Sequence, residues 1–504
     1  MQNIISAHRL VHLDLKGASP KTSYFEKIFP VFKKLGATGI LIEWEDTFPY
    51  AEEVADIGSS GPANHGLYSK EDASLLLQLA KQNGLIVIPL VQTFGHLEFV
   101  LKHKTFHNLR EVENYPSSMC PTNPNSLTLV KAMIRQIVEF HSDINFLHIG
   151  ADEVWHMALC ERCQAQVVLE KPENRKSRLF LNHVLAVAKF IQNTYPSLGI
   201  IIWDDMLRGM STEILMEYDL GKYVEPMIWH YRAEDNFQLP TDMWEKYSKI
   251  FPNFWVASAF KGATGSSRML PIPSYHINNH MTWLKILTEE AGKFERFRGV
   301  ALTGWSRYDH FATLCEMLPV GIPCLALCLR SWIAGSFSPE IHDSVSKDLG
   351  YSPSISLNPY PRPQLLTQGK LEFPGWEIMV GVEWFSNLQD KIRSVIEGDQ
   401  VETWFNEWQI RNSYTNPMQI ESILASFSSI LTELASVEVY LRRHMASVFH
   451  MSTVNEWLGT WVEPRRKKLV QLEHDAQLQM RIGGKVEGGD FQFSTEDVQM
   501  EPQT

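Results

Sequence analysis

Two adjacent acids, Asp152 and Glu153, are the residues whose type and position most clearly suggest chemistry in this sequence. They follow an apolar run of strand character, residues 146–149, and a glycine, Gly150. Neighbouring side chains on a strand point to opposite faces, so two adjacent acids can act together only where the strand has ended and the backbone turns. Gly150 permits such a turn. The alternative is that one acid merely caps a following helix.

Paired acids suit the hydrolysis of glycosidic bonds. One acid can stay protonated and give a proton to the leaving oxygen, while the other stays ionised beside developing positive charge. Acids that flank a bond from opposite sides usually come from different strands. Neighbours at one strand end are better placed to act on a group that the substrate itself carries, which favours substrate-assisted hydrolysis.

The segments around the acids predict the scaffold that positions them. From residue 9 to about residue 334, short β-rich apolar runs alternate with amphipathic stretches, for example 24–35, 70–82, 126–140 and 177–194, which is typical of repeated β-α units. Eight such units predict a closed (β/α)₈ TIM barrel of the α/β class, with its chemistry at the carboxyl ends of the strands. The expected strands are 10–15, 38–43, 85–91, 146–150, 199–203, 223–229, 254–259 and 299–304.

Polar and aromatic residues crowd the ends of these expected strands, as a catalytic barrel requires. Ordinary loop polarity accounts for part of this convergence. The residues are Asp14, Lys16, Glu43, Glu45, Asp46, Gln92, His96, Asp152, Glu153, Asp204, Asp205, Trp229, His230, Tyr231, Lys261, Trp305, Arg307 and Asp309.

Length and composition are those of a globular protein. The chain has 504 residues, with 44% hydrophobic and 21% charged residues. Its net charge of -12 argues against nucleic acid or an anionic membrane as a partner and favours a small neutral substrate. We find no uninterrupted apolar stretch of about 18 residues and expect no membrane span.

The sequence also predicts where the protein resides. The N-terminus lacks the pattern of a secretory signal, cysteines are few, and no Asn-x-Ser/Thr acceptor occurs. We therefore expect a cytoplasmic or nuclear protein that is not secreted.

Beyond the barrel, the composition changes. We expect a catalytic barrel over 1–340, an irregular linker rich in proline over 341–374, a helical accessory region over 375–482 and a disordered tail over 483–504. Long loops at 51–68 and 109–124 are either pocket walls or surface excursions. The sequence leaves open whether the helical region adds to the pocket or makes a homodimer contact.

The motif from His148 to Glu153, His-Ile-Gly-Ala-Asp-Glu, resembles the His-x-Gly-x-Asp-Glu signature of family 20 glycoside hydrolases, the β-N-acetylhexosaminidases. Residues 93–96, Thr-Phe-Gly-His, are similar to the family's Thr-Pro-Gly-His after the third strand. The stretches 13–17, 202–206 and 257–263 look like the hexosaminidase D branch of the family. The resemblance implies an exo-acting enzyme that removes terminal N-acetyl-β-D-hexosamine, galactosamine or glucosamine, from glycoconjugates without a metal or an organic cofactor.

The resemblance also implies site residues. Asp152 and Glu153 would be catalytic, and the other candidates would bind substrate, with the tryptophans stacking on sugar. Asp14 or Lys16 would replace the family's sugar-gripping Arg, and Arg307 stands where a Glu is usual. Asp204 and Asp205 could instead pair with basic groups. The substrate-binding candidates are His96, His148, Trp203, Asp204, Trp229, Trp305, Asp14 and Arg307.

The implied mechanism is substrate-assisted and retaining. The carbonyl oxygen of the 2-acetamido group attacks the anomeric carbon while Asp152 orients that group and stabilises its positive charge. Glu153 protonates the departing oxygen and then takes a proton from the water that opens the intermediate.

Two other functions remain in view. The first is a hexosaminidase that acts on modified proteins, like the family 84 barrels, for which an Asp-Asp pair would be expected. The second is a catalytically silent barrel that binds amino sugars or proteins, because a fold alone does not establish activity.

Cys160 and Cys163 have the spacing of metal ligands, but the sequence shows no second Cys pair, so it does not predict a zinc site.

Overall fold

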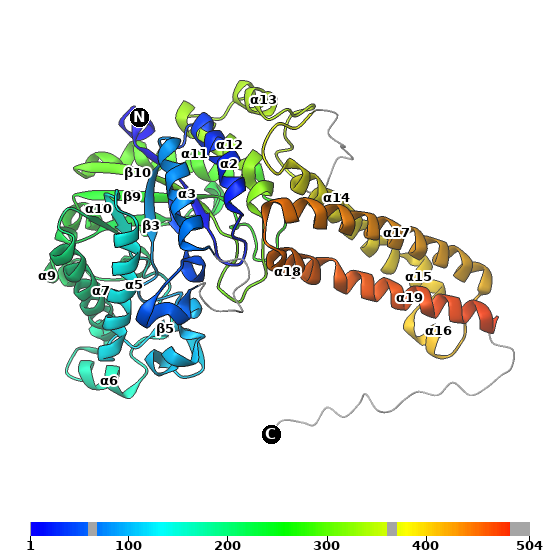
Figure 1. The fold of residues 1–504 in the computed structure, drawn as a ribbon, viewed down its shortest axis with the longest axis horizontal. Helices are drawn as coiled ribbons and strands as arrows, with labels where there is room; N and C mark the ends of the chain where they lie inside the picture. The colour runs from blue at the N-terminus through cyan, green and yellow to red at the C-terminus, as the bar shows by residue number, and fades with distance from the viewer. Residues whose placement is uncertain (1, 59–67, 360–369, 484–504) are drawn as a thin grey trace. The chain divides into compact units, whose positions relative to one another are not determined.

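Eight parallel strands form a closed barrel in a computed structural model that describes residues 2–58, 68–359 and 370–483 (Figure 1). Neighbouring strands follow one another in chain order around the barrel, and β10 closes it against β1. The predicted (β/α)₈ fold is therefore confirmed, with each strand within a few residues of its expected position. The strands are β1 (His8–Asp14), β2 (Gly39–Glu43), β3 (Ile86–Leu90), β6 (Phe146–His148), β7 (Gly199–Trp203), β8 (Glu225–Trp229), β9 (Asn253–Lys261) and β10 (Arg296–Gly304).

Amphipathic helices alternate with these strands along the chain. In the first long helix, Phe25, Ile28, Phe29 and Phe32 are buried at three- and four-residue spacing, which gives the helix one apolar side. The helices of this part are α1 (Gln2–Ser6), α2 (Thr22–Leu35), α3 (Lys70–Gln82), α4 (Glu98–Leu101), α5 (Pro124–Phe140), α6 (Glu161–Val167), α7 (Arg175–Thr194), α8 (Asp205–Arg208), α9 (Thr212–Glu217), α10 (Met243–Ile250), α11 (Pro273–Glu290), α12 (Leu318–Ala334) and α13 (Pro339–Asp348).

The interior of the barrel is filled with side chains rather than open. Seven of the strands contribute side chains to one buried cluster. It includes Trp203, at the carboxyl end of β7, with 1% of its surface exposed. Trp229, Tyr231 and Trp305 pack against this cluster but are only partly buried. The strand register places Asp14 of β1 beside Glu43 of β2, so their carboxyl ends lie at one level.

The longest excursion from the barrel lies between β3 and α5. It contains the 3₁₀ helix Lys104–Leu109 and a hairpin of two antiparallel strands, β4 (Arg110–Val112) and β5 (Tyr115–Met119). The loop expected at 109–124 is thus an ordered hairpin. In the other long loop, a 3₁₀ helix covers Glu52–Ile57, while residues 59–67 lie outside the described part of the chain.

The segment 341–374, expected to be irregular, begins inside a helix. Helix α13 has Ser338 as its N-cap and Pro339 in its first turn, two local signals that favour a helix start. Residues 360–369 of this segment, and 484–504 of the expected tail, lie outside the described residues.

Residues 381–443 and 456–504 form a second unit, which is helical over its described residues; residues 444–455 group with the barrel unit. In this second unit the indole of Trp384 and the ammonium of Lys391 both donate hydrogen bonds to the carboxylate of Glu433, at 3.1 and 2.7 Å. The elements that contribute to it are α14 (Trp376–Ile396), α15 (Asp399–Trp404), α16 (Glu407–Arg411), α17 (Pro417–Val448), α18 (Met451–Trp461) and α19 (Glu463–Ile482).

Helix α17 is long and apolar enough to cross a membrane when judged by length and composition alone. The core helix of a soluble protein passes the same test, and here the apolar residues are buried at alternating spacings of three and four, as in Ile423, Phe427, Ile430, Leu434 and Val437. One buried stripe accounts for the apolar character, and the absence of a membrane span stays a prediction.

We predict that Leu434→Ala lowers the free energy of unfolding by about 2–5 kcal/mol, because it leaves a cavity in this stripe. The matched control is Val439→Ala, whose side chain is 69% exposed on the same helix and which should change stability by about 0.5 kcal/mol or less. Urea unfolding followed by helical circular dichroism measures both. Equal effects of the two substitutions would contradict the packing described for α17.

Candidate active site

The chain reverses sharply after β6, and this reversal delivers the two acids. Gly150, Ala151 and Glu153 all have positive φ, at 62°, 66° and 46°. A Cβ at Gly150 would also meet the side chain of Gln92, so both the positive φ and the space favour glycine there. Left-handed backbone at a residue other than glycine costs roughly 1–3 kcal/mol and tends to occur at functional sites. The turn predicted at Gly150 is confirmed, and it is strained.

His96 bridges the two acids. Its Nε2 lies 3.2 Å from Oε2 of Glu153 and 3.5 Å from Oδ2 of Asp152. The backbone makes this approach possible, because a Cβ at Gly95 would collide with the carbonyl oxygen of Asp152. Three residues that the sequence singled out, from the ends of β3 and β6, are therefore in contact.

The two acids have different surroundings. The side chain of Asp152 is 10% exposed and that of Glu153 is 34% exposed. Burial raises the pKa of Asp152 to about 7, although the charge of His96 opposes this shift. Burial lowers the pKa of His96, but Asp152 and Glu153 more than compensate and raise it to about 10. His96 is therefore a cation at neutral pH, and it is positioned to favour ionisation of Asp152.

Asp205, at the start of α8 and just after β7, makes hydrogen bonds to residues from two other strand ends. Its Oδ2 accepts a hydrogen bond from the backbone N–H of Glu153 at 3.0 Å, and its Oδ1 accepts one from the indole of Trp229 at 3.1 Å. Burial raises the pKa of Asp205 to about 6. Asp205, rather than its neighbour Asp204, is therefore the member of the pair that contacts the site.

Asp204 is not placed to bind substrate, which corrects that expectation. It is fully buried, and Arg208 donates to both of its oxygens at 2.7 and 2.6 Å. The backbone N–H of Trp229 and the hydroxyl of Tyr247 also donate to its carboxylate. Arg208 lies four residues after Asp204, and this spacing in the sequence indicates an ion pair along a helix.

Three aromatic rings remain partly exposed above the barrel core: Trp229, Tyr231 and Trp305. The rings of Trp229 and Tyr231 stack with centroids 5.2 Å apart. Burial, together with the charges of Asp152 and Glu153, raises the pKa of the Tyr231 hydroxyl, which places Tyr231 near both acids. Tyr231 follows the end of β8, and that position was the signal in the sequence for a site residue.

Trp203, expected to stack on sugar, lies beneath this open layer. With 1% of its surface exposed it offers no free face to a sugar ring, and its centroid is 6.2 Å from that of Trp305. His148 packs against it and is also fully buried. The Nδ1 of His148 accepts a hydrogen bond from the N–H of Gly150, and burial lowers the pKa of His148 to about 3. Both residues are thus buried beside the turn, and their contact with substrate stays a prediction.

Asp14 and Arg307 are also committed to protein contacts. The carboxylate of Asp14 accepts from the backbone N–H of Ser306 at 2.7 Å and pairs with Lys16 at 2.9 Å. The guanidinium of Arg307 lies against Gly17, and its Nη1 donates to the carbonyl of Ala312. The expected contacts of Asp14 and Arg307 with substrate stay predictions.

A buried network of charges lies below the acids. Lys16 is 4% exposed and faces Asp14, Glu43 and Glu45, with Trp305 over its ammonium at 4.9 Å. Burial favours the neutral amine, but the three carboxylates raise the pKa of Lys16 far above its usual value. Lys16 thus supports the floor of the site.

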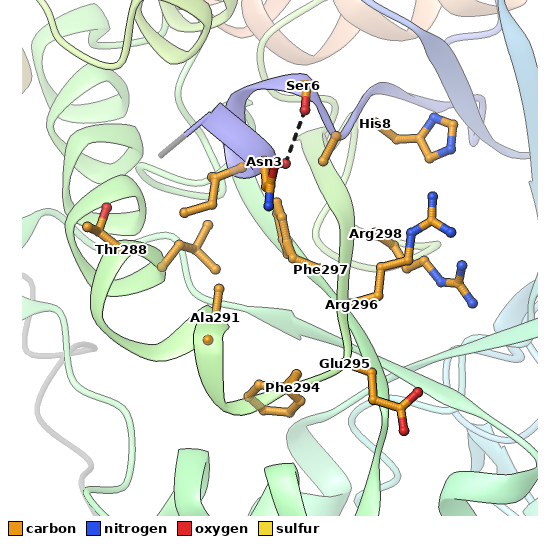
Figure 2. Close-up of a pocket in the computed structure, with 14 residues that line it drawn as sticks. Asn3, Ser6, His8, Thr288, Ala291, Phe294, Glu295, Arg296, Phe297 and Arg298 are labelled. Atoms are coloured by element: carbon orange, nitrogen blue, oxygen red, sulfur yellow. Dashed lines mark hydrogen bonds between the residues drawn. The ribbon is translucent and has the colours of Figure 1, made fainter.

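A cavity of about 730 Å³ lies elsewhere in the barrel (Figure 2). His8, Arg296 and Arg298, at the amino ends of β1 and β10, contribute to its lining. Barrel chemistry takes place at the opposite, carboxyl ends of the strands, where Asp152 and Glu153 lie. This cavity is not part of the candidate active site.

Comparison with known proteins identifies the family. A sequence profile described as the glycosyl hydrolase family 20 catalytic domain matches residues 13–242, which include His96, Asp152 and Glu153. Hexosaminidase D of Homo sapiens is 38% identical over 470 residues, which cover 93% of this chain and 94% of that protein. The chain belongs to glycosyl hydrolase family 20. It is therefore a glycoside hydrolase, and its family supports a substrate that ends in a hexosamine.

Two further proteins are similar to this chain. Hexosaminidase D of Bos taurus is 44% identical over 345 residues, which cover 68% of this chain and 97% of that protein. The solved structure of a β-N-acetylhexosaminidase from Bacteroides fragilis NCTC 9343 aligns with a TM-score of 0.48 at 15% identity and covers 67% of each chain.

We predict that His96→Asn moves the acid limb of the kcat/KM profile to higher pH. The positive charge of His96 lowers the pKa of Asp152, so its removal raises that pKa above about 7 and leaves Asp152 protonated at neutral pH. His107→Asn, an exposed histidine on the same excursion, is the control and should leave the profile unchanged. If the acid limb of the His96→Asn profile stayed at the wild-type pH, the effect of His96 on the pKa of Asp152 would be contradicted.

Proposed function

We propose that this protein is an exo-acting β-N-acetylhexosaminidase that removes terminal non-reducing N-acetyl-β-D-hexosamine from glycoconjugates. The sugar is galactosamine, glucosamine or both. One observation carries the proposal: the carboxylates of Asp152 and Glu153 both reach one nitrogen of His96, so the two acids act from one side of the site. Acids on one side suit a substrate that supplies its own nucleophile.

In the proposed first step, the carbonyl oxygen of the 2-acetamido group attacks the anomeric carbon, and the glycosidic bond breaks. Glu153, the more exposed acid, gives its proton to the leaving oxygen. The product is a cyclic oxazolinium-like intermediate. Asp152 orients the acetamido N–H and stabilises the positive charge that develops there.

In the second step, Glu153 takes a proton from water, whose oxygen attacks the anomeric carbon and reopens the ring. Two displacements at one carbon retain its configuration. Burial raises the pKa of Asp152 to about 7 in the free site, but a positive charge on the bound substrate favours the ionised carboxylate. The substrate's own charge therefore helps to produce the form of Asp152 that stabilises it.

The partly exposed rings supply the sugar-binding surface in this proposal. Trp229 and Trp305 offer flat apolar faces for the sugar. Asp205 fixes the indole of Trp229 and the backbone of Glu153 with one carboxylate, which couples the sugar-binding ring to the general acid. Because its hydroxyl lies in the field of both acids, Tyr231 is our candidate for the donor to the acetamido carbonyl.

We further propose that the protein acts in the cytoplasm or the nucleus. The six cysteines are all free in the structure, as reducing compartments favour. The acidic net charge of -12 supports a partner that is neither nucleic acid nor an anionic membrane.

We predict that Glu153→Gln lowers kcat on the order of 10²- to 10⁴-fold for a disaccharide with a poor leaving group, because general acid catalysis is lost. The loss should be smaller for the 4-nitrophenyl N-acetyl-β-galactosaminide and glucosaminide, whose leaving groups need little protonation. Comparing both nitrophenyl sugars in the wild type also ranks the two epimers.

Glu173→Gln, an exposed acid outside the site, is the matched control for this substitution and should retain full activity. A folded wild-type protein without activity on either sugar, from mildly acid to neutral pH, would contradict the proposal. That result would favour a barrel that binds amino sugars without cleaving them.

A further inference from the structure

A cluster of four potential metal ligands lies outside the active site. Three thiols, from Cys120, Cys160 and Cys163, meet the carboxylate of Glu111, and one ligand atom of each lies within 4.8 Å of all the others. Glu111 is in β4, Cys120 follows β5, and Cys160 and Cys163 are at the start of α6. The sequence showed only the Cys160 and Cys163 pair, because the hairpin supplies its ligands from 40 or more residues earlier in the chain.

The spacing of these atoms matches a tetrahedral zinc site. The Sγ of Cys120 lies 3.5 Å from that of Cys160 and 3.6 Å from that of Cys163. Four ligands around zinc, with zinc to sulfur at about 2.3 Å, place neighbouring sulfurs about 3.8 Å apart. A disulfide would require about 2.05 Å between sulfurs. The three thiols are therefore unbonded and spaced as zinc ligands are.

The charge of Glu111 gives an independent reason for a cation. Glu111 is 3% exposed, and its Oε1 accepts from the backbone N–H groups of Leu159 and Cys160. Its Oε2 lies 3.1 Å from the Sγ of Cys163. Within the part of the chain that the structure describes, no lysine or arginine pairs with this carboxylate. A buried carboxylate with no counter-ion is costly, and a divalent ion between Glu111 and the thiolates would supply the missing charge.

We propose that Glu111, Cys120, Cys160 and Cys163 bind one structural zinc ion. All four positions around the ion are filled by protein groups, as in structural sites, so this zinc takes no part in the hydrolysis. The carboxylate is held by two backbone N–H groups, and the N–H of Cys163 donates to the Sγ of Cys160 at 3.4 Å. Such hydrogen bonds orient ligands and stabilise the thiolate.

The position of the site shows what this zinc would do. The hairpin is hydrogen-bonded to the segment after His96: the N–H of Leu97 donates to the carbonyl of Ser117 at 3.0 Å. Cys160 follows Glu153 by only seven residues. The ion would tie the hairpin beside His96 to the loop that carries Glu153, and so stabilise the strained backbone of the acid pair.

Zinc content measured by mass spectrometry tests the proposal on the full chain, purified without metal-affinity resin or chelator. We expect about one zinc per chain in the wild type and in Cys324→Ala, which removes a buried thiol of α12 outside the cluster. Cys120→Ser should lose most of the metal. Glu111→Gln keeps an oxygen for the backbone N–H groups but loses the charge, so its zinc affinity should fall on the order of tenfold or more.

A second measurement uses only the wild type and does not depend on how the variants fold. Cobalt replacing zinc in the wild type should give the visible absorption of a tetrahedral site and a thiolate-to-cobalt charge-transfer band. A wild type that holds no stoichiometric zinc, even after incubation with a zinc salt, would overturn the proposal. So would a disulfide involving Cys120 in protein alkylated without reductant, which would indicate a redox pair instead.

Discussion

The contact of one imidazolium with two carboxylates is the interaction on which the candidate site depends. Two acids that are neighbours in sequence repel each other when both are charged, and burial adds to the cost of ionising Asp152. His96, with its pKa raised to about 10, supplies the compensating charge. This contact requires close approach of two loops, which the chain achieves with Gly95 on one side and Gly150 on the other.

Inside the barrel, buried carboxylates are likewise balanced by cationic groups. Burial alone would raise the pKa of Glu43, but Lys16 and His12 lower it to about 2, so Glu43 is an anion in the interior. Gln92 lies between this layer and the acids, donating to Glu43 at 3.5 Å and accepting from the N–H of Ala151 at 3.2 Å. The position of the turn at Gly150 is thus fixed by buried polar groups, which is a role for buried networks that are fully hydrogen-bonded.

The sequence was sufficient to predict the barrel, because each of the eight strands is a short apolar run and strand order follows chain order. It also predicted the turn at Gly150 and a pocket role for His96, but the contact of His96 with both acids is visible only in the structure. It favoured Asp204 over Asp205 as a substrate contact, since both follow β7 and only the fold shows which one Arg208 occupies. It missed Cys120 as a third thiol because a metal ligand set assembles in space, and its spacing along the chain carries no fixed pattern.

The identity of the nucleophile decides the mechanism of hydrolysis, and one series of substrates tests it. A series of 4-nitrophenyl β-hexosaminides in which the 2-acetamido methyl carries zero, one, two or three fluorines makes the carbonyl oxygen progressively less nucleophilic, with little change in size. If that oxygen attacks the anomeric carbon, log kcat/KM falls steeply and linearly with fluorine substitution. A flat dependence would show that a group of the protein or a water attacks instead, and would contradict the role given to Asp152 and Glu153.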